Sequence, residues 1–259
     1  MIFILLSRNL AGLKQWQTQI TQFLNEKLHL LVNQRATRVA PVSGGVDFAG
    51  FIVRPHYKLV RRRVVGNLKQ KLERIESQLV KAQGDLVIYH FARELLRECQ
   101  AMMNSYLSHF SHAKSKKLIW KIRQQFLFLN NYFILVGNKL ILADKSLSEL
   151  KRLRQQIKWV NKKYQDYYCL IQIGFYYEVF GEHAKSVAEM MGFRLQENWR
   201  GFRHSCGFPK WRLKKVEEQL QSRCIPYVIV HQTGRELYLA KDRLPYRMVE
   251  YHPRSKPNL

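Results

Sequence analysis

Several features are scarce in this sequence of 259 residues. No apolar run reaches the about 18 residues that a membrane-spanning helix needs. No Gly-x-x-x-x-Gly-Lys-Ser/Thr loop occurs, so ATP binding is not supported. The first residues, Met1–Ser7, have no basic segment and are too short for a secretory signal. Cysteines stand widely apart, without a Cys-x-x-Cys pair, at Cys99, Cys169, Cys206 and Cys224. This pattern favours reduced thiols in a cytoplasmic protein over a disulfide scaffold.

Acidic residues are also scarce. The chain has 19 Asp and Glu against 44 Lys and Arg, which gives a net charge of +25 and a pI of about 10.1. A hydrophobic share of 46%, with 12% aromatic residues, excludes a disordered basic tail. Such a charge indicates a phosphate-rich partner, chiefly nucleic acid. An anionic membrane surface is the weaker alternative.

The positive charge is gathered in three segments without acidic residues, at 54–63, 111–125 and 151–163. Each segment also holds an aromatic residue, so cations for phosphates lie beside flat rings for bases. The alternative interpretation is a set of solvated basic helix faces. The candidate phosphate contacts are Arg54, Lys58, Arg61, Arg62, Arg63, Lys114, Lys116 and Lys117.

Apolar spacing predicts an α+β fold. In the first part we expect a buried strand within 1–10, a helix over 13–28 and a hairpin over 38–53 that turns at Ser43-Gly44-Gly45. Leu68, Leu72, Ile75 and Leu79 form one helical stripe. Gly84 should end that helix and Asp85 cap the next, and residues 86–163 should continue as helices with a weak break at Gly137-Asn138.

After Tyr164 the pattern alternates, which predicts a small domain with a mixed sheet. The expected strands are 169–173, 225–231 and 236–240, the helices 182–191 and 211–223, and the turns 207–209 and 233–234. We therefore divide the chain into residues 1–63, 64–163, 164–251 and a tail over 252–259.

Phe48-Ala49-Gly50-Phe51 follows a Gly-rich turn and precedes an arginine run. This order resembles the primer grip of bacterial reverse transcriptases, especially those of diversity-generating retroelements. Asn104-Ser105-Tyr106-Leu107-Ser108-His109 resembles the NSYxGH motif of their helical thumb. The resemblance implies a palm remnant over 1–63 and a basic thumb over 64–163. Phe48, Gly50 and Phe51 would then be primer-grip-like residues.

The catalytic centre of that family depends on a Y-x-D-D hairpin just before a strand such as F-x-L-L-S. Met1–Ser7 resembles only that strand, so the two metal-binding aspartates would lie before Met1. The resemblance therefore implies grip without polymerisation, since Mg²⁺ is expected only for an intact enzyme. The alternative is an RNA-directed DNA polymerase whose catalytic half is missing or supplied by a partner chain.

Gly174-Phe175-Tyr176-Tyr177-Glu178-Val179-Phe180 stands within a run, Tyr164–Lys185, that resembles the N-terminal mismatch-recognition domain of MutS. In that family a Phe wedges against the mispaired base and a Glu hydrogen-bonds it. Position by position, Tyr176 takes the place of the Phe and Glu178 that of the Glu, while Phe175 replaces an Asp. An aromatic wedge stacks on an exposed base, and a mismatched base is exposed at a lower cost in free energy than a paired one. The alternative is that Tyr176 is a core residue.

Two His and Cys groups have poor metal spacing, namely His109-x-x-His112 and His204-x-Cys206 with Cys224 and His231, so we predict no metal site and no cofactor. No signature of nucleophilic catalysis is present, so we predict no catalytic residues. We therefore expect a non-catalytic protein that grips a duplex and recognises mismatched DNA, with an RNA–DNA hybrid as a second candidate partner. An oligomerisation role for the helical part is the structural alternative.

Overall fold

The computed structural model describes residues 4–34, 37–144, 147–237 and 240–252. Its helices are α1 (Leu10–Leu28), α2 (Arg62–Leu79), α3 (Arg93–Ser111), α4 (Lys116–Gln125), α5 (Phe128–Tyr132), α6 (Leu153–Lys163), α7 (Glu182–Met191) and α8 (Leu213–Ser222). Short 3-10 helices are η1 (Val42–Gly44), η2 (Leu147–Glu149) and η3 (Lys210–Arg212).

The strands are β1 (Val46–Phe48), β2 (Phe51–Arg54), β3 (Tyr57–Val60), β4 (Val80–Gln83), β5 (Leu86–His90), β6 (Phe133–Val136), β7 (Lys139–Leu142), β8 (Tyr168–Ile173), β9 (Tyr176–Phe180), β10 (Leu195–Trp199), β11 (Phe202–Pro209), β12 (Tyr227–Leu237) and β13 (Ala240–Tyr251). The chain forms two compact units, residues 1–46 with 53–56 and residues 47–52 with 57–259.

Helix α1 dominates the first unit and confirms the helix predicted over 13–28. Asn9 caps it, because its side-chain oxygen accepts a hydrogen bond from the backbone N–H of Gly12 at 3.2 Å. The strand predicted within 1–10 is wrong for residues 4–9, which form no strand and expose Ile4, Leu5 and Leu6. An apolar run becomes a strand only where a second strand is available to pair with it, and no strand in the described residues pairs with this run. Residues 1–3 lie outside the described residues.

The hairpin predicted over 38–53 is shorter than expected. Its strands are β1 and β2, and its turn is Ala49-Gly50, where both φ angles are positive, at 49° and 84°. Two positive φ angles match the twist of the strands, as in a type I′ turn. Ser43 and Gly44 instead lie in η1, before the hairpin. With β3, these strands form a three-stranded sheet in the order β1-β2-β3.

Helix α2 confirms the predicted stripe, since Leu68, Leu72 and Leu79 are buried. The next segment corrects the prediction. Gly84 and Asp85 form the two-residue turn of the β4–β5 hairpin, with φ +62° at Gly84, so Asp85 caps no helix. Helix α3 begins only at Arg93.

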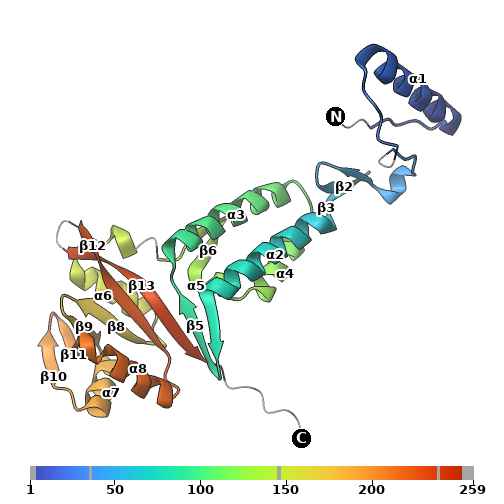
Figure 1. The fold of residues 1–259 in the computed structure, drawn as a ribbon. Helices are drawn as coiled ribbons and strands as arrows, with labels where there is room; N and C mark the ends of the chain where they lie inside the picture. Colours follow the sequence, from blue (N-terminus) through green and yellow to red (C-terminus); the bar gives the residue numbers. More distant parts are fainter. Residues whose placement is uncertain (1–3, 35–36, 145–146, 238–239, 253–259) are drawn as a thin grey trace, which may run out of the picture. The chain divides into compact units, whose positions relative to one another are not determined.

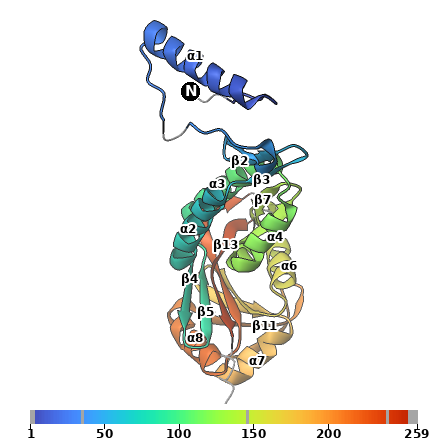
Figure 2. The ribbon, with the colours of Figure 1, turned by 90° about the vertical axis from the view of Figure 1, so that its right-hand side faces the viewer.

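The helical segments predicted over 86–163, with a weak break at Gly137-Asn138, are also interrupted there by a second hairpin. Gly137 and Asn138 turn β6 into β7, which pair from Phe133 with Leu142 to Val136 with Lys139. Asn104 of α3 binds this hairpin twice, donating to the carbonyl of Leu140 at 3.1 Å and accepting from its N–H at 2.7 Å. This asparagine therefore has a structural role in the motif at 104–109. Helices α2 and α3 lie side by side (Figure 2).

An eight-stranded sheet runs in the order β10-β11-β9-β8-β12-β13-β5-β4. Strands β8 and β12 are parallel, and the other neighbouring strands of this sheet are antiparallel. Strand β13 lies beside β5 (Figure 1), so the sheet crosses the boundary that we place near residue 164. The mixed α/β character expected for 164–251 is confirmed.

Both faces of this sheet are covered, and alternate residues of each strand face opposite sides. In β12, Tyr227 and Ile229 pack with α7 and α8, whereas Val228 and Val230 pack into the core that includes α2, α3 and α6. A sheet covered on both faces holds its connecting turns in defined positions. The candidate site lies among these turns.

Within the C-terminal part, β8 and α7 confirm the strand at 169–173 and the helix at 182–191. Helix α8 and strand β12 agree approximately with 211–223 and 225–231. The turn predicted at 207–209 is wrong, because these residues end β11. Thr233-Gly234 lies within β12 at a register irregularity, not at a turn.

Strand β13 was not predicted. The expected strand at 236–240 combines residues of two paired strands, since Leu237 of β12 pairs with Ala240 of β13. Pro245 lies in β13 where the register with β12 shifts. A strand with proline at a bulge does not show simple alternation in its sequence. Residues 253–259, most of the predicted tail, lie outside the described residues.

Candidate nucleic-acid interface

The β8–β9 turn presents two neighbouring aromatic side chains. Gly174 and Phe175 form the turn, because Ile173 pairs with Tyr176. Gly174 has φ +64°, a left-handed conformation that favours glycine. Phe175 is 82% exposed and Tyr176 is 52% exposed. Tyr177, the next residue, is buried, so the two exposed rings are a local feature of the turn.

Glu178 is held by the β10–β11 turn. Its carboxylate accepts a hydrogen bond from the indole Nε1 of Trp199 at 3.2 Å and forms an ion pair with Arg200 at 3.4 Å. The Arg200 guanidinium in turn lies 5.2 Å from the Trp199 ring centroid. The side chain of Glu178 is only 12% exposed. Tyr176 is therefore accessible, whereas Glu178 is covered.

Lys210, in η3, adds a cation beside Phe175. Its backbone N–H donates to the carbonyl of Phe175 at 3.0 Å, and its Nζ lies 5.6 Å from the centroid of the Phe175 ring. Pro209 pairs with Tyr176 at the end of β11, which holds η3 next to the β8–β9 turn. Trp211, the next residue, is largely exposed. Aromatic and cationic side chains thus alternate at this place.

A buried polar network supports the β8–β9 turn from behind. Arg243 is 3% exposed and donates to the carbonyl of Gln172 at 2.8 Å, to Gln156 Oε1 at 2.9 Å and to Gln232 Oε1 at 3.0 Å. Gln232 Oε1 also accepts from the N–H of Gly174 at 3.0 Å. The amide of Gln172 donates to the carbonyl of Gly174 at 3.2 Å. The turn is therefore bonded through both of its backbone groups at Gly174.

The guanidinium of Arg243 makes its hydrogen bonds to neutral oxygens. Burial, and after it the charge of Arg200, lowers the pKa of Arg243 to about 10. It is still protonated at neutral pH. Arg154 of α6 donates to the carbonyl of Gly201 at 3.2 Å, which links the basic segment 151–163 to the β10–β11 turn. Several cations therefore lie around the covered Glu178.

A second basic surface surrounds the β1–β2 turn. The ring of Phe51 stacks on His109 of α3, with centroids 4.2 Å apart and planes 20° apart. Lys58 Nζ lies 5.9 Å from the centroid of Phe51. The two motifs that resemble a reverse transcriptase therefore meet in space. Phe48 is exposed, and a Cβ on Gly50 would lie 3.1 Å from His109 Nε2.

The predicted phosphate contacts differ in their surroundings. Arg61 pairs with Asp47 at 3.1 Å, and Lys114 Nζ lies 5.4 Å from the ring of Tyr57. The backbone N–H of Lys114 donates to the carbonyl of Lys58 at 3.0 Å, which joins these two segments. Arg54 is half-buried at the end of β2. The exposed members are Lys58, Arg62, Arg63, Lys114, Lys116 and Lys117.

Sequence reasoning did not single out Phe175, Trp199, Arg200 and Lys210, which the structure brings close to Tyr176 and Glu178. A signal for some of them was present, because Pro209-Lys210-Trp211-Arg212 places an aromatic between cations. The contacts of Trp199 and Arg200 with Glu178 join residues about 21 positions apart. Such contacts depend on the pairing of β9, β10 and β11, which local patterns do not reveal.

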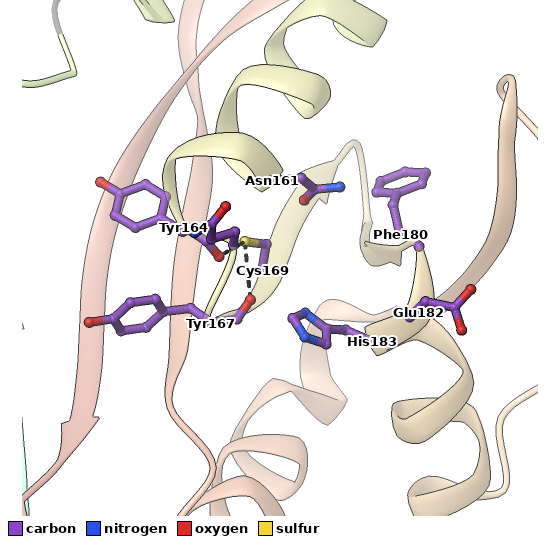
Figure 3. A pocket seen from close by; sticks show the side chains of 9 residues that line it. Asn161, Tyr164, Tyr167, Cys169, Phe180, Glu182 and His183 are labelled. Carbon is purple, nitrogen blue, oxygen red and sulfur yellow. Dashed lines mark hydrogen bonds between the residues drawn. The ribbon is translucent and has the colours of Figure 1, made fainter.

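A separate pocket of about 280 Å³ lies between the end of α6 and the start of α7 (Figure 3). Asn161, Tyr164, Cys169, Phe180 and His183 are among its lining residues. The Cys169 thiol donates to the backbone carbonyl of Tyr164, with sulfur and oxygen 3.6 Å apart. Burial raises the pKa of this thiol to about 12, which disfavours the nucleophilic thiolate at neutral pH. None of the predicted site residues lines this pocket.

The described part of the chain has neither a cluster of metal-ligating side chains nor a helix suited to a bilayer. There, no group of three or more His, Cys, Asp or Glu side chains is arranged to hold a metal ion. His109 is instead engaged with Phe51. None of the described helices is both long enough and apolar enough to span a bilayer.

Comparison with known proteins adds to this geometry. No curated protein matches the chain. One family model does, and it covers α6, the β8–β9 turn, Glu178 and most of β13. The matched region begins before Tyr164, the first residue of the run that resembles MutS. Residues 151–249 match the model of MutS domain I.

Proposed function

We propose that residues 151–249 bind duplex DNA at mispaired or distorted steps, with Tyr176 as the side chain that enters the helix. The observation that carries this proposal is the exposed aromatic turn. Tyr176 is half exposed beside a turn that is hydrogen-bonded to the Arg243 network, within a region that matches MutS domain I. A core role would require Tyr176 to be buried like Tyr177.

Mismatch preference follows from the cost of unstacking. A paired step must be opened before a ring can enter, whereas a mispaired base has already lost part of its pairing energy. Stacking on an aromatic ring contributes about 1–3 kcal/mol per base. Lys210 beside the β8–β9 turn, with Arg154 and Arg200 at the β10–β11 turn, supplies positive charge that attracts phosphates independently of sequence.

Fluorescence anisotropy at two salt concentrations tests this proposal. The probes are a matched duplex, the same duplex with one mismatch, and one with a short unpaired loop. We expect the wild type to prefer the second and third probes and Tyr176→Ala to lose much of that preference. Tyr176→Phe, which keeps the ring, should retain it. Equal binding of the wild type to all three probes would refute mismatch recognition.

We also propose that the second basic surface grips the phosphate backbone of a duplex. Its exposed cations lie in β3, at the start of α2, and just before and at the start of α4. Arg62→Gln with Arg63→Gln should weaken binding to every probe alike and reduce the slope of log K against log salt by about 2. Arg194→Gln with Arg223→Gln, at other exposed positions, is the matched control. The same loss in both pairs would indicate an effect of net charge alone.

A second candidate function is binding of a template–primer duplex as part of an RNA-directed DNA polymerase. One observation favours it, namely the stacking of Phe51 on His109, which joins the two motifs of that resemblance. An RNA–DNA hybrid should then bind at least as tightly as the matched DNA duplex, and Phe51→Ala should weaken the hybrid more than DNA. Clearly weaker binding of the hybrid would count against this function. Both candidate functions are binding functions and require no catalytic step from this chain's residues.

A further inference from the structure

Resting on the proposed function, we infer that Phe175 stacks on the unpaired base and that Lys210 contacts the phosphate next to it. The ligand class is an extrahelical or unpaired nucleotide of any base identity. At the position of Phe175, the MutS domain that this region resembles has an acidic residue. This chain therefore carries an additional ring at the turn. Recognition would then depend on two adjacent rings and one cation.

The position of Phe175 supports a binding role. It is one of the two turn residues between β8 and β9, and at 82% it is far more exposed than Tyr176. A large exposed ring contributes nothing to the core, since the apolar side chains of the sheet pack on its two faces without it. Its backbone is nonetheless held in place by the hydrogen bond from Lys210 N–H. An exposed ring on a fixed backbone can stack with little loss of conformational freedom.

Lys210 gives this ring a charged companion. The ammonium 5.6 Å from the ring centroid is a cation–π contact, which keeps the long lysine side chain beside Phe175. No ion pair of Lys210 with an acidic residue is present among the described side chains. A base that stacks on Phe175 brings the phosphate of its own nucleotide, or of the next one, close to this ammonium. Both groups of a nucleotide are therefore met by neighbouring residues.

The contacts of Glu178 explain why the site should accept any unpaired base. Its carboxylate already accepts from Trp199 and pairs with Arg200, so it offers little hydrogen bonding to a base. Stacking is tolerant of base identity because every base has a π face. We therefore expect the site to distinguish unpaired from paired bases more strongly than one mismatch from another.

The test uses the full chain and a looped duplex that carries 2-aminopurine at an unpaired position. Wild type should quench the 2-aminopurine emission, because stacking on a ring alters it, and should bind the looped probe more tightly than the matched duplex. Phe175→Ala should weaken binding to the looped probe by about 5- to 150-fold and leave binding to the matched duplex unchanged. Phe175→Leu, apolar but without a ring, should also lose the quenching. Phe23→Ala, which removes an exposed ring from α1, is the matched control and should resemble wild type.

Lys210→Gln separates the charge from the ring. It should lower the salt slope of looped-probe binding by about 1 and keep the quenching. Unchanged affinity and quenching in Phe175→Ala, with loss in Tyr176→Ala, would overturn the inference and leave the proposed function intact. Should wild type not distinguish looped from matched duplexes, the proposed function fails. If wild type then quenches a single strand that carries 2-aminopurine and Phe175→Ala does not, the inference is still supported. If both proteins quench it equally, the inference is refuted.

Discussion

Phe51 and His109 stack face to face, with their ring centroids 4.2 Å apart, although 58 positions separate them in the chain (109 − 51). Gly50 lies close to this contact, since a Cβ there would be 3.1 Å from His109 Nε2. A side chain at position 50 would therefore crowd His109, and glycine allows the β1–β2 turn to approach helix α3 closely. The structure of the second basic surface therefore depends on the conformation of this turn.

Gly50→Ala should destabilise the protein by about 1–3 kcal/mol, because alanine is strained at φ +84° and its methyl group would contact His109. Thermal unfolding measures the change. Gly66→Ala is the matched control within α2, where a Cβ meets nothing within 4 Å and alanine favours the helix. That control should be neutral or up to about 1 kcal/mol more stable. Equal changes in both variants would contradict the role of the close approach.

Arg243→Lys should lower stability by about 1–3 kcal/mol, since lysine cannot replace the several hydrogen bonds of the buried guanidinium and leaves acceptors such as Gln156 Oε1 unpaired. Because Gln232 also holds Gly174, the β8–β9 turn should loosen. Denaturant unfolding reports the first effect, and amide hydrogen exchange at Gly174 reports the second. Unchanged exchange there would mean that the network does not brace the turn.

Glu178→Gln should cost less than about 1 kcal/mol of stability, because it removes a partly exposed ion pair and retains an acceptor for Trp199. Arg200 would then be free for phosphates. Affinity for all duplexes should rise by about two- to fivefold, since one unit charge a few ångströms away is worth up to ~1 kcal/mol in water. A loss of mismatch binding instead would indicate that Glu178 itself contacts the base, as the MutS resemblance implies.

Two histidines should make stability fall in mild acid. Burial lowers the pKa of His90, as do the charges of Lys81 and Arg247, and burial with Arg247 and Lys210 lowers that of His231. The unfolded chain then binds more protons than the folded protein once the pH drops below the ordinary value of 6.5. Melting temperature should therefore decrease as pH falls through 6.5 and change little from these groups above it. His90→Asn with His231→Asn should flatten that slope, and an identical slope would exclude this cause.

The secondary structure was predictable where one face of an element is buried and the pattern is local. Leu68, Leu72 and Leu79 repeat at helical spacing and are buried as the stripe in α2 requires. Gly192, with φ +64°, ends α7 where glycine predicts a helix end. These signals depend only on residues close together in the sequence, so they can be recognised without the tertiary structure.

The hairpins β4–β5 and β6–β7 could not be identified in the same way. Gly84 and Gly137 fit both interpretations, because a glycine can break a helix or form a hairpin turn. Short apolar runs such as Phe133–Val136 fit either a helix or a strand. Only pairing with a partner strand decides between them, and β13 likewise exists as a strand because β5 and β12 flank it.

For the candidate site, the sequence by itself determined the positive charge, the aromatic residues at 175–177 and the resemblance to MutS that the match at 151–249 supports. Tertiary structure alone decided which of these groups are accessible. Tyr176 and Glu178 lie two residues apart, yet the first is half exposed and the second is covered by Trp199 and Arg200. Local spacing sets which face of a strand a side chain occupies. Whether another segment covers that face depends on contacts between residues distant in the chain.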